Sequence, residues 1–119
     1  MRAAGRDWEN AALAYLQQAG LELLARNFTT RLGEIDLVMR DRHAGVVFVE
    51  VRYRGAAARA SAAASVGPAK RAKLLRVAGI YLQAHPLLAD AECRFDVIAC
   101  GGTLAQPTFD WIRGAFERD

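Results

Sequence analysis

The chain has 119 residues, of which 53% are hydrophobic and 24% are charged, and its formal net charge is +3. High apolar content and low net charge exclude a chain that is disordered as a whole and favour one domain with a hydrophobic core. No apolar run reaches the roughly 20 residues that a membrane-spanning helix needs, and the first residues lack the apolar segment of a signal peptide. We therefore expect a single domain over residues 1–119, located in the cytoplasm and without a membrane partner.

Basic residues are concentrated between Arg40 and Arg76. This stretch holds nine basic and two acidic residues, a net charge of +7, so the rest of the chain sums to −4. A concentrated basic region is typical of proteins that bind a polyanion such as nucleic acid. A solvated, arginine-rich surface would have the same composition.

The first predicted element is a helix from Trp8 to Gln18, with Asp7 as its N-cap and Gly20 after its end. Glu9 falls on the apolar face of this helix, where an acid needs either an arginine partner, a rim position or a functional role. The residues of that face are Trp8, Ala11, Ala12, Tyr15, Leu16 and Ala19.

Three strands are predicted to follow, over Leu21–Phe28, from Gly33 to Met39 and over Val46–Val51. Alternation places Ile35, Leu37 and Met39 on one face of the second strand, and Glu34, Asp36, Val38 and Arg40 on the other. The short loop 41–45 predicts that the third strand returns antiparallel to the second.

Two acids interrupt these apolar strands. Asp36 lies within the second strand, and Glu50 lies within the third, two residues before Arg52 and on the same face. Charged groups in such strands are costly to bury unless they are paired or bind a metal. An acid on one strand beside an acid-x-base on the next is how several metal-dependent nucleases hold magnesium, whereas an internal network of ion pairs is the purely structural alternative.

The second half of the chain predicts a loop, a helix and two strands. The Ala-rich segment 55–67 is expected to be a mobile loop or a marginal helix that could close over a substrate. A helix from Pro68 to about Ala84 should point Lys73 and Arg76 away from its core face, which is formed by Leu74, Leu75, Ala78, Tyr81 and Leu82. Strands are predicted at Arg94–Ala99 and Thr108–Ile112, and Cys93 and Cys100 are expected to be reduced, packed thiols. The order α-β-β-β-α-β-β predicts a three-layer α/β or α+β domain with a mixed sheet.

The motifs GEIDLV at 33–38, FVEVRYR at 48–54, GPAKRAKLLRVAGIYL at 67–82 and RFDVIA at 94–99 carry a resemblance over nearly the whole chain. The chain resembles the PD-(D/E)XK nuclease superfamily, with its restriction-endonuclease-like α-β-β-β-α-β core, and within it the YraN-like family of small bacterial proteins. The resemblance implies that Asp36 and Glu50 ligate Mg²⁺ or Mn²⁺. It also implies that Glu9 completes the catalytic site or orients a water.

Basic residues are predicted to contact nucleic acid, and for Lys70 the resemblance itself implies a contact with phosphate. Arg52, Arg54, Lys70 and Lys73 are the predicted nucleic-acid contacts, and Arg52 also belongs to the catalytic set. The superfamily motif ends in lysine where this chain has Arg52, and arginine stays protonated and cannot act as a general base. Trp8 stands where the family more often has a small residue.

Three functions are compatible with the sequence. The first is a metal-dependent endonuclease acting on DNA. The resemblance to junction-resolving enzymes would add branched DNA as a substrate and a homodimer as the assembly. The second is a non-catalytic DNA- or RNA-binding module, suggested by Arg52. The third is a protein–protein adaptor that uses Phe109, Trp111 and Phe116 as anchors, although core packing is the alternative for these aromatic residues.

Overall fold

The computed structural model describes residues 2–43, 45–53 and 66–116, and side chains from residue 5 onward. Its centre is a five-stranded sheet in the order β1-β2-β3-β4-β5. The strands are β1 (Glu22–Thr30), β2 (Gly33–Asp41), β3 (Gly45–Tyr53), β4 (Cys93–Gly102) and β5 (Pro107–Phe116). Only the β3–β4 pair is parallel within this sheet, because α3 (Pro68–Ala84) lies between those two strands in the chain.

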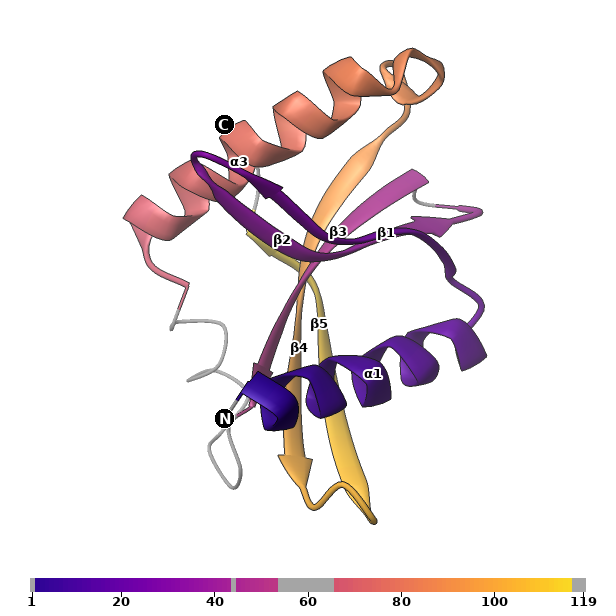
Figure 1. The fold of residues 1–119 in the computed structure, drawn as a ribbon. Helices are drawn as coiled ribbons and strands as arrows, with labels where there is room; N and C mark the ends of the chain where they lie inside the picture. Colours follow the sequence, from indigo (N-terminus) through magenta and orange to yellow (C-terminus); the bar gives the residue numbers. More distant parts are fainter. Residues whose placement is uncertain (1, 44, 54–65, 117–119) are drawn as a thin grey trace.

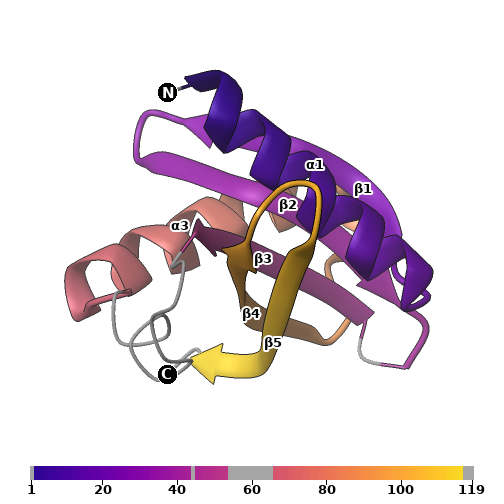
Figure 2. The ribbon, with the colours of Figure 1, turned by 90° about the horizontal axis from the view of Figure 1, so that it is seen from below.

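Two long helices cover the two faces of the sheet, as Figures 1 and 2 show. Helix α1 (Arg2–Gln18) packs on one face, where Ala12 and Leu16 join a buried cluster with Leu37, Val49 and Ile98. Helix α3 packs on the other face through its buried residues Leu74, Val77, Ala78 and Tyr81. A short 3-10 helix, η1 (Pro86–Leu88), leads from α3 to β4. The α-β-β-β-α-β-β order and the mixed sheet are therefore confirmed.

Several predicted boundaries were wrong. Helix α1 begins at Arg2, so Asp7 lies inside the helix and is not its N-cap. The alanines at 3 and 4 favour helix more strongly than a single capping residue favours a start. Strand β1 begins and ends later than predicted because Thr29 and Thr30 pair with Glu34 and Gly33 in the hairpin. Strands β4 and β5 also extend beyond the predicted ranges, to Gly102 and Phe116.

The predicted alternation of β2 was also wrong at one point. Ile35 packs in the cluster beneath α3, whereas Leu37 and Met39 pack in the cluster beneath α1. The side chains of β1, which pairs with β2, also switch faces at this level. Arg26 reaches Glu9 of α1, whereas the ring of Phe28 contacts Tyr81 of α3. Asn27, between them, is the one described non-glycine residue with positive φ, at 50°. This irregularity interrupts the period of two at the level of Asp36.

The aromatic side chains near the C-terminus belong to the core. Phe116 is buried, and Phe109 and Trp111 are partly buried against the cluster beneath α1. They are not the exposed anchors that an adaptor would use. Trp111 donates its indole N–H to the buried carboxylate of Asp96 at 2.7 Å.

Cys93 is half-buried and Cys100 is buried, and burial raises the pKa of Cys100 to about 11. Among the described helices, none is long and apolar enough to cross a membrane. The predicted mobile loop at 55–67 lies mostly outside the described residues, as does Arg54.

Candidate metal centre and nucleic-acid interface

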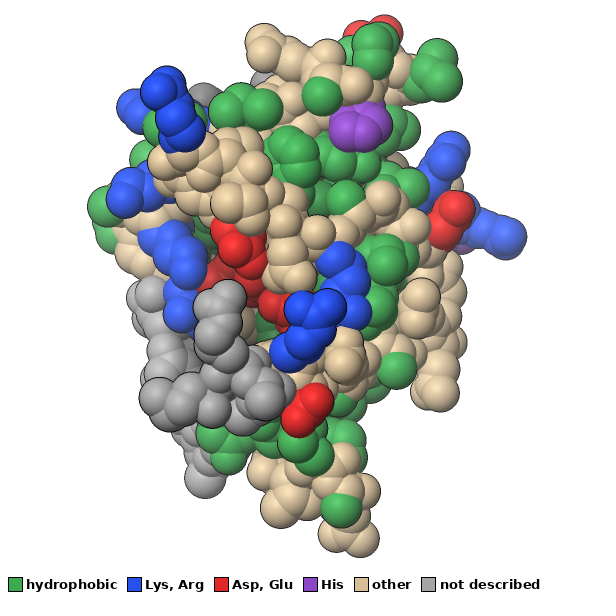
Figure 3. All heavy atoms as spheres, in the orientation of Figure 1, with side chains coloured by type: hydrophobic (Ala, Val, Ile, Leu, Met, Phe, Trp, Pro, Cys, Tyr) green, Lys and Arg blue, Asp and Glu red, His purple; other side chains and the backbone are tan. Residues whose placement is uncertain are grey.

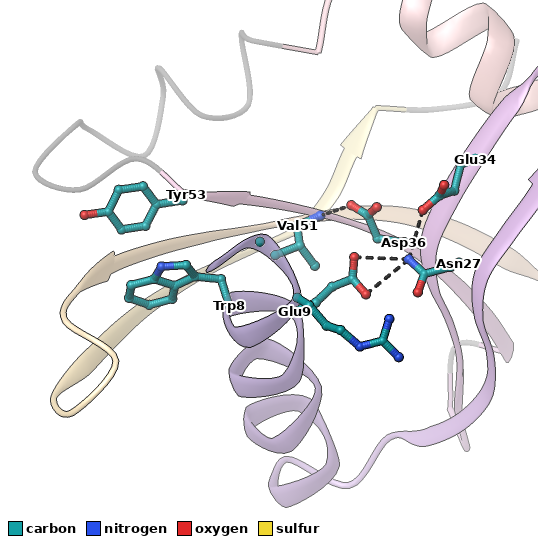
Figure 4. A pocket seen from close by; sticks show the side chains of 9 residues that line it. Trp8, Glu9, Asn27, Glu34, Asp36, Val51 and Tyr53 are labelled. Carbon is teal, nitrogen blue, oxygen red and sulfur yellow. Dashed lines mark hydrogen bonds between the residues drawn. The ribbon is translucent and has the colours of Figure 1, made fainter. Parts of the chain in front are cut away.

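Three carboxylates from two elements meet at one point. Glu9 comes from α1, and Glu34 and Asp36 come from β2, and one candidate ligand oxygen from each lies within 4.8 Å of the others. Figure 4 shows the three side chains converging from the helix and the strand. Such a spacing allows a single divalent cation to contact all three, and oxygen ligands are those that Mg²⁺ and Mn²⁺ prefer.

Asn27 holds two of these acids in place. Its side-chain N–H₂ group donates to both carboxylate oxygens of Glu9, each at 3.1 Å, and to Glu34 at 2.9 Å. Arg26 also donates to Glu9, at 3.1 Å, which is the arginine pairing that the sequence left open for this acid. The positive φ of Asn27 turns its side chain toward both carboxylates, so the irregular point of β1 positions the site.

Asp36 is the acid whose ionisation is most strongly disfavoured. Burial raises its pKa to about 7, and the negative charges of Glu50, Glu9 and Glu34 add to the shift. One hydrogen bond opposes it, because the backbone N–H of Val51 donates to the Asp36 carboxylate at 2.8 Å. A divalent cation at this point would favour the ionised form, so the donor set fits a metal.

Glu50 does not belong to the group of three acids and pairs instead with two cations. It is buried, and it accepts hydrogen bonds or ion pairs from Lys70 Nζ at 2.6 Å and from the Arg52 guanidinium at 3.2 Å. Its charge still acts on Asp36, and both side chains line one cavity. The assignment of Glu50 as a metal ligand stays a prediction. Lys70, from α3, brings an amine next to the motif whose final position is Arg52.

Two cavities open on either side of the shared acids Glu34 and Asp36. The first, of about 640 Å³, lies beside α1 and is also lined by Arg6, Trp8, Glu9, Asn27 and Tyr53. The second, of about 620 Å³, lies beside α3 and is also lined by Glu50, Lys70 and Lys73. Figure 3 shows acidic side chains near the middle of this face with basic side chains on both sides. The acids are therefore flanked by basic residues on both sides, by Arg6 in the first cavity and by Lys70 and Lys73 in the second.

Two residues of this site were missed by sequence reasoning. Glu34 was placed on the same strand face as Asp36, and two carboxylates at positions i and i+2 were a usable signal for a metal pair. Asn27 gave a weaker signal, as Asn is among the few residues that tolerate positive φ, but the sequence alone could not place it beside Glu9.

The sequence is similar to known proteins over nearly all of its length. The pattern of the family described as "Uncharacterised protein family UPF0102" matches residues 8–100. A UPF0102 protein of Xanthomonas campestris is 52% identical over 111 residues, which are 93% of this chain and 88% of that protein. One from Stutzerimonas stutzeri is 47% identical over 116 residues, covering 98% of this chain and 96% of that protein. One from Xylella fastidiosa is 49% identical over 118 residues, covering 99% and 95%.

Proposed function

This chain belongs to the UPF0102, or YraN-like, family, as its motifs indicated, and we propose that it is a divalent-metal-dependent phosphodiesterase that cleaves nucleic acid, with DNA as the substrate. One observation carries the proposal. Glu9, Glu34 and Asp36 form a compact acid cluster between two cavities, and Asp36 has a pKa raised to about 7. Acids that repel each other at neutral pH destabilise a fold, so their assembly in an accessible cleft supports a functional role.

The three acids would hold Mg²⁺ or Mn²⁺, and Asp36 would be its central ligand because it lines both cavities and is less exposed than Glu34, which also lines both. When bound, the metal supplies a Lewis acid for the phosphate and lowers the pKa of a coordinated water. Asn27 keeps Glu9 and Glu34 oriented through its amide. The protein thus contributes a preorganised set of oxygens whose positions are fixed by neighbouring hydrogen bonds.

The basic residues beside the acids would receive the phosphate. Lys70 and Lys73 line the second cavity, and Lys70 is held close to the cluster by its contact with Glu50. The Nε of Arg52 is buried and has no hydrogen-bond partner among the described residues, so the ion pair with Glu50 leaves one donor of this guanidinium unpaired. Fixed cations near a phosphate stabilise the negative charge that grows in the transition state. Lys70 would therefore supply the amine that the superfamily motif has at its last position, where this chain has Arg52.

The alternative is a module that binds nucleic acid without cleaving it. Arg52 favours this alternative, since it cannot take a proton from water. A binding module would bind through phosphate contacts, with affinity that falls steeply with salt and does not depend on metal. Metal dependence therefore separates the two functions.

Cleavage assays with end-labelled DNA test the proposal. Single-stranded, linear duplex, forked and four-way-junction substrates are incubated with EDTA, Mg²⁺ or Mn²⁺. The variant Asp36→Asn removes the central acid, and Asp90→Asn is the matched control because Asp90 is exposed and does not line either cavity. We expect cleavage that requires metal, persists in the control and is lost in Asp36→Asn. Absence of metal-dependent cleavage, or full activity of Asp36→Asn, would contradict the proposal.

A further inference from the structure

Two aromatic side chains lie at the mouth of the first cavity. Trp8 precedes Glu9 on α1, and Tyr53 ends β3, two residues after the Val51 N–H that binds Asp36. Their ring centroids are 4.8 Å apart, with 39° between the ring planes. Figure 4 shows the pair on one side of the acids, facing the same space.

Tyr53, the last residue of β3, is the one exposed residue of that strand. Its side chain is 53% exposed, although most large apolar side chains of β3 are buried. Trp8 is only partly buried against the cluster beneath α1, so one face of the pair stays open to the cavity. Aromatic surface left open beside charged groups is a feature of sites that stack planar ligands.

Resting on the function proposed above, we propose that Trp8 and Tyr53 form a stacking platform for an unpaired base, so that the substrate is single-stranded nucleic acid or the unpaired arm of a branched one. A base on this platform lies in the cavity that Glu9, Glu34 and Asp36 also line. The phosphate attached to that nucleotide is thereby directed to the acids. The exposed Arg6, which lines the same cavity, offers a cation to the preceding phosphate.

The second cavity would hold the next part of the bound nucleic-acid strand. Lys70 and Lys73 line it beyond the acids, so the backbone leaving the platform meets positive charge. Proteins that bind single strands combine a basic groove with aromatic rings in this way. A duplex cannot use the platform, because both faces of each internal base are covered by its neighbours.

Fluorescence of 2-aminopurine, a base analogue that is quenched by stacking, tests the platform. The analogue is placed in a single strand and in the blunt duplex formed by annealing that strand to its complement, both with phosphorothioate linkages that slow hydrolysis. Tyr53→Ala removes the exposed ring, and Tyr53→Phe keeps it. Tyr15→Ala is the matched control, because Tyr15 is also partly exposed and stacked, on Phe109, but does not line the cavity.

We expect the single strand to bind more tightly than the blunt duplex, and its analogue to be quenched on binding. Tyr53→Ala should weaken single-strand affinity about 5- to 100-fold and abolish the quenching, while Tyr53→Phe and Tyr15→Ala keep both. Equal affinity for both substrates, or a single-strand affinity unchanged in Tyr53→Ala, would overturn the platform even if the protein cleaves DNA. Quenching that depends on Tyr53 without cleavage under any metal would support the platform and refute the nuclease.

Discussion

Replacing Asp36 by asparagine should stabilise the protein above pH 7, and this gain should vanish near pH 4. Asparagine has the shape of a protonated aspartic acid and keeps an oxygen that can accept the Val51 N–H. The substitution therefore removes the charge while preserving the hydrogen bond. A substitution in the proposed metal-binding cluster that raises stability is the expected mark of a site whose assembly costs the fold free energy.

The pKa of Asp36 sets the magnitude and the sign. The pKa rises from 3.8 to about 7 on folding, so the folded chain binds more protons than the unfolded chain between these values. The free energy of unfolding therefore falls as pH rises from about 4 to about 7, and the full penalty is present above about 7. At about 1.4 kcal/mol per pKa unit, the penalty is about 4 kcal/mol at most. Because the neighbouring acids share the repulsion, we expect a gain of about 2–4 kcal/mol, or about 8–16 °C in Tm for a chain of this length.

Thermal unfolding followed by circular dichroism at pH values from about 4.5 to about 8.5 measures this difference. Wild type, Asp36→Asn and the exposed control Asp90→Asn are compared in parallel. Millimolar Mg²⁺ is then added at the highest pH. It should raise the Tm of wild type and of the control, because a cation bound to the folded state shifts the equilibrium, and it should have little effect on Asp36→Asn.

A Tm difference between wild type and Asp36→Asn that is the same at both ends of the pH range would refute a raised pKa of Asp36. The raised pKa would also be refuted by an Asp36→Asn variant that is less stable than wild type at about pH 8.5. Either result would mean that Asp36 ionises readily in the folded protein and that its neighbours do not repel it. A Mg²⁺ effect of equal size in all three proteins would place the cation elsewhere.

Other contacts of the site and of the core can be tested one at a time. Lys70→Ala should lower the cleavage rate about 10²- to 10³-fold in single-turnover assays, whereas Lys73→Ala should mainly weaken binding and reduce its dependence on salt. Asn27→Gly keeps the positive φ but loses the amide, and calorimetry should detect Mg²⁺ affinity lower by about 10-fold or more. Asp96→Ala should lower the free energy of unfolding by about 3–5 kcal/mol in denaturant titrations. The substitution removes a carboxylate that is 1% exposed and leaves Arg94 without this charge partner. Cys100 should resist a thiol reagent at about pH 8 until the chain unfolds, because its pKa is raised to about 11.

Much of the fold could be predicted because it depends on local patterns. Strand alternation placed Glu50 and Arg52 on one face, and the structure brings their side chains to 3.2 Å. The helix Pro68–Ala84 was predicted with its observed bounds, because a proline starts it and His85-Pro86 ends it. These signals lie within a few residues of the elements that they define.

The rest of the site depends on contacts between distant residues. The pairing of Lys70 with Glu50 joins α3 to β3, and neither the helix pattern nor the strand pattern contains that information. The change of face at Asn27 is a single irregular backbone conformation, which a period of two cannot anticipate. Glu34 was placed correctly on its strand, but it was not recognised as a neighbour of Glu9 because the two residues belong to different elements.

The position of the acid cluster has a consequence for how the proposed metal centre forms during folding. Its parts come from residue 9 in α1, from the β1–β2 hairpin and, through Lys70 and Glu50, from α3 and β3. No hairpin or helix folding by itself contains the centre, and contacts between residues so far apart in the chain form slowly. A nascent or partly unfolded molecule would therefore lack the proposed centre, which would assemble only when all three layers have docked.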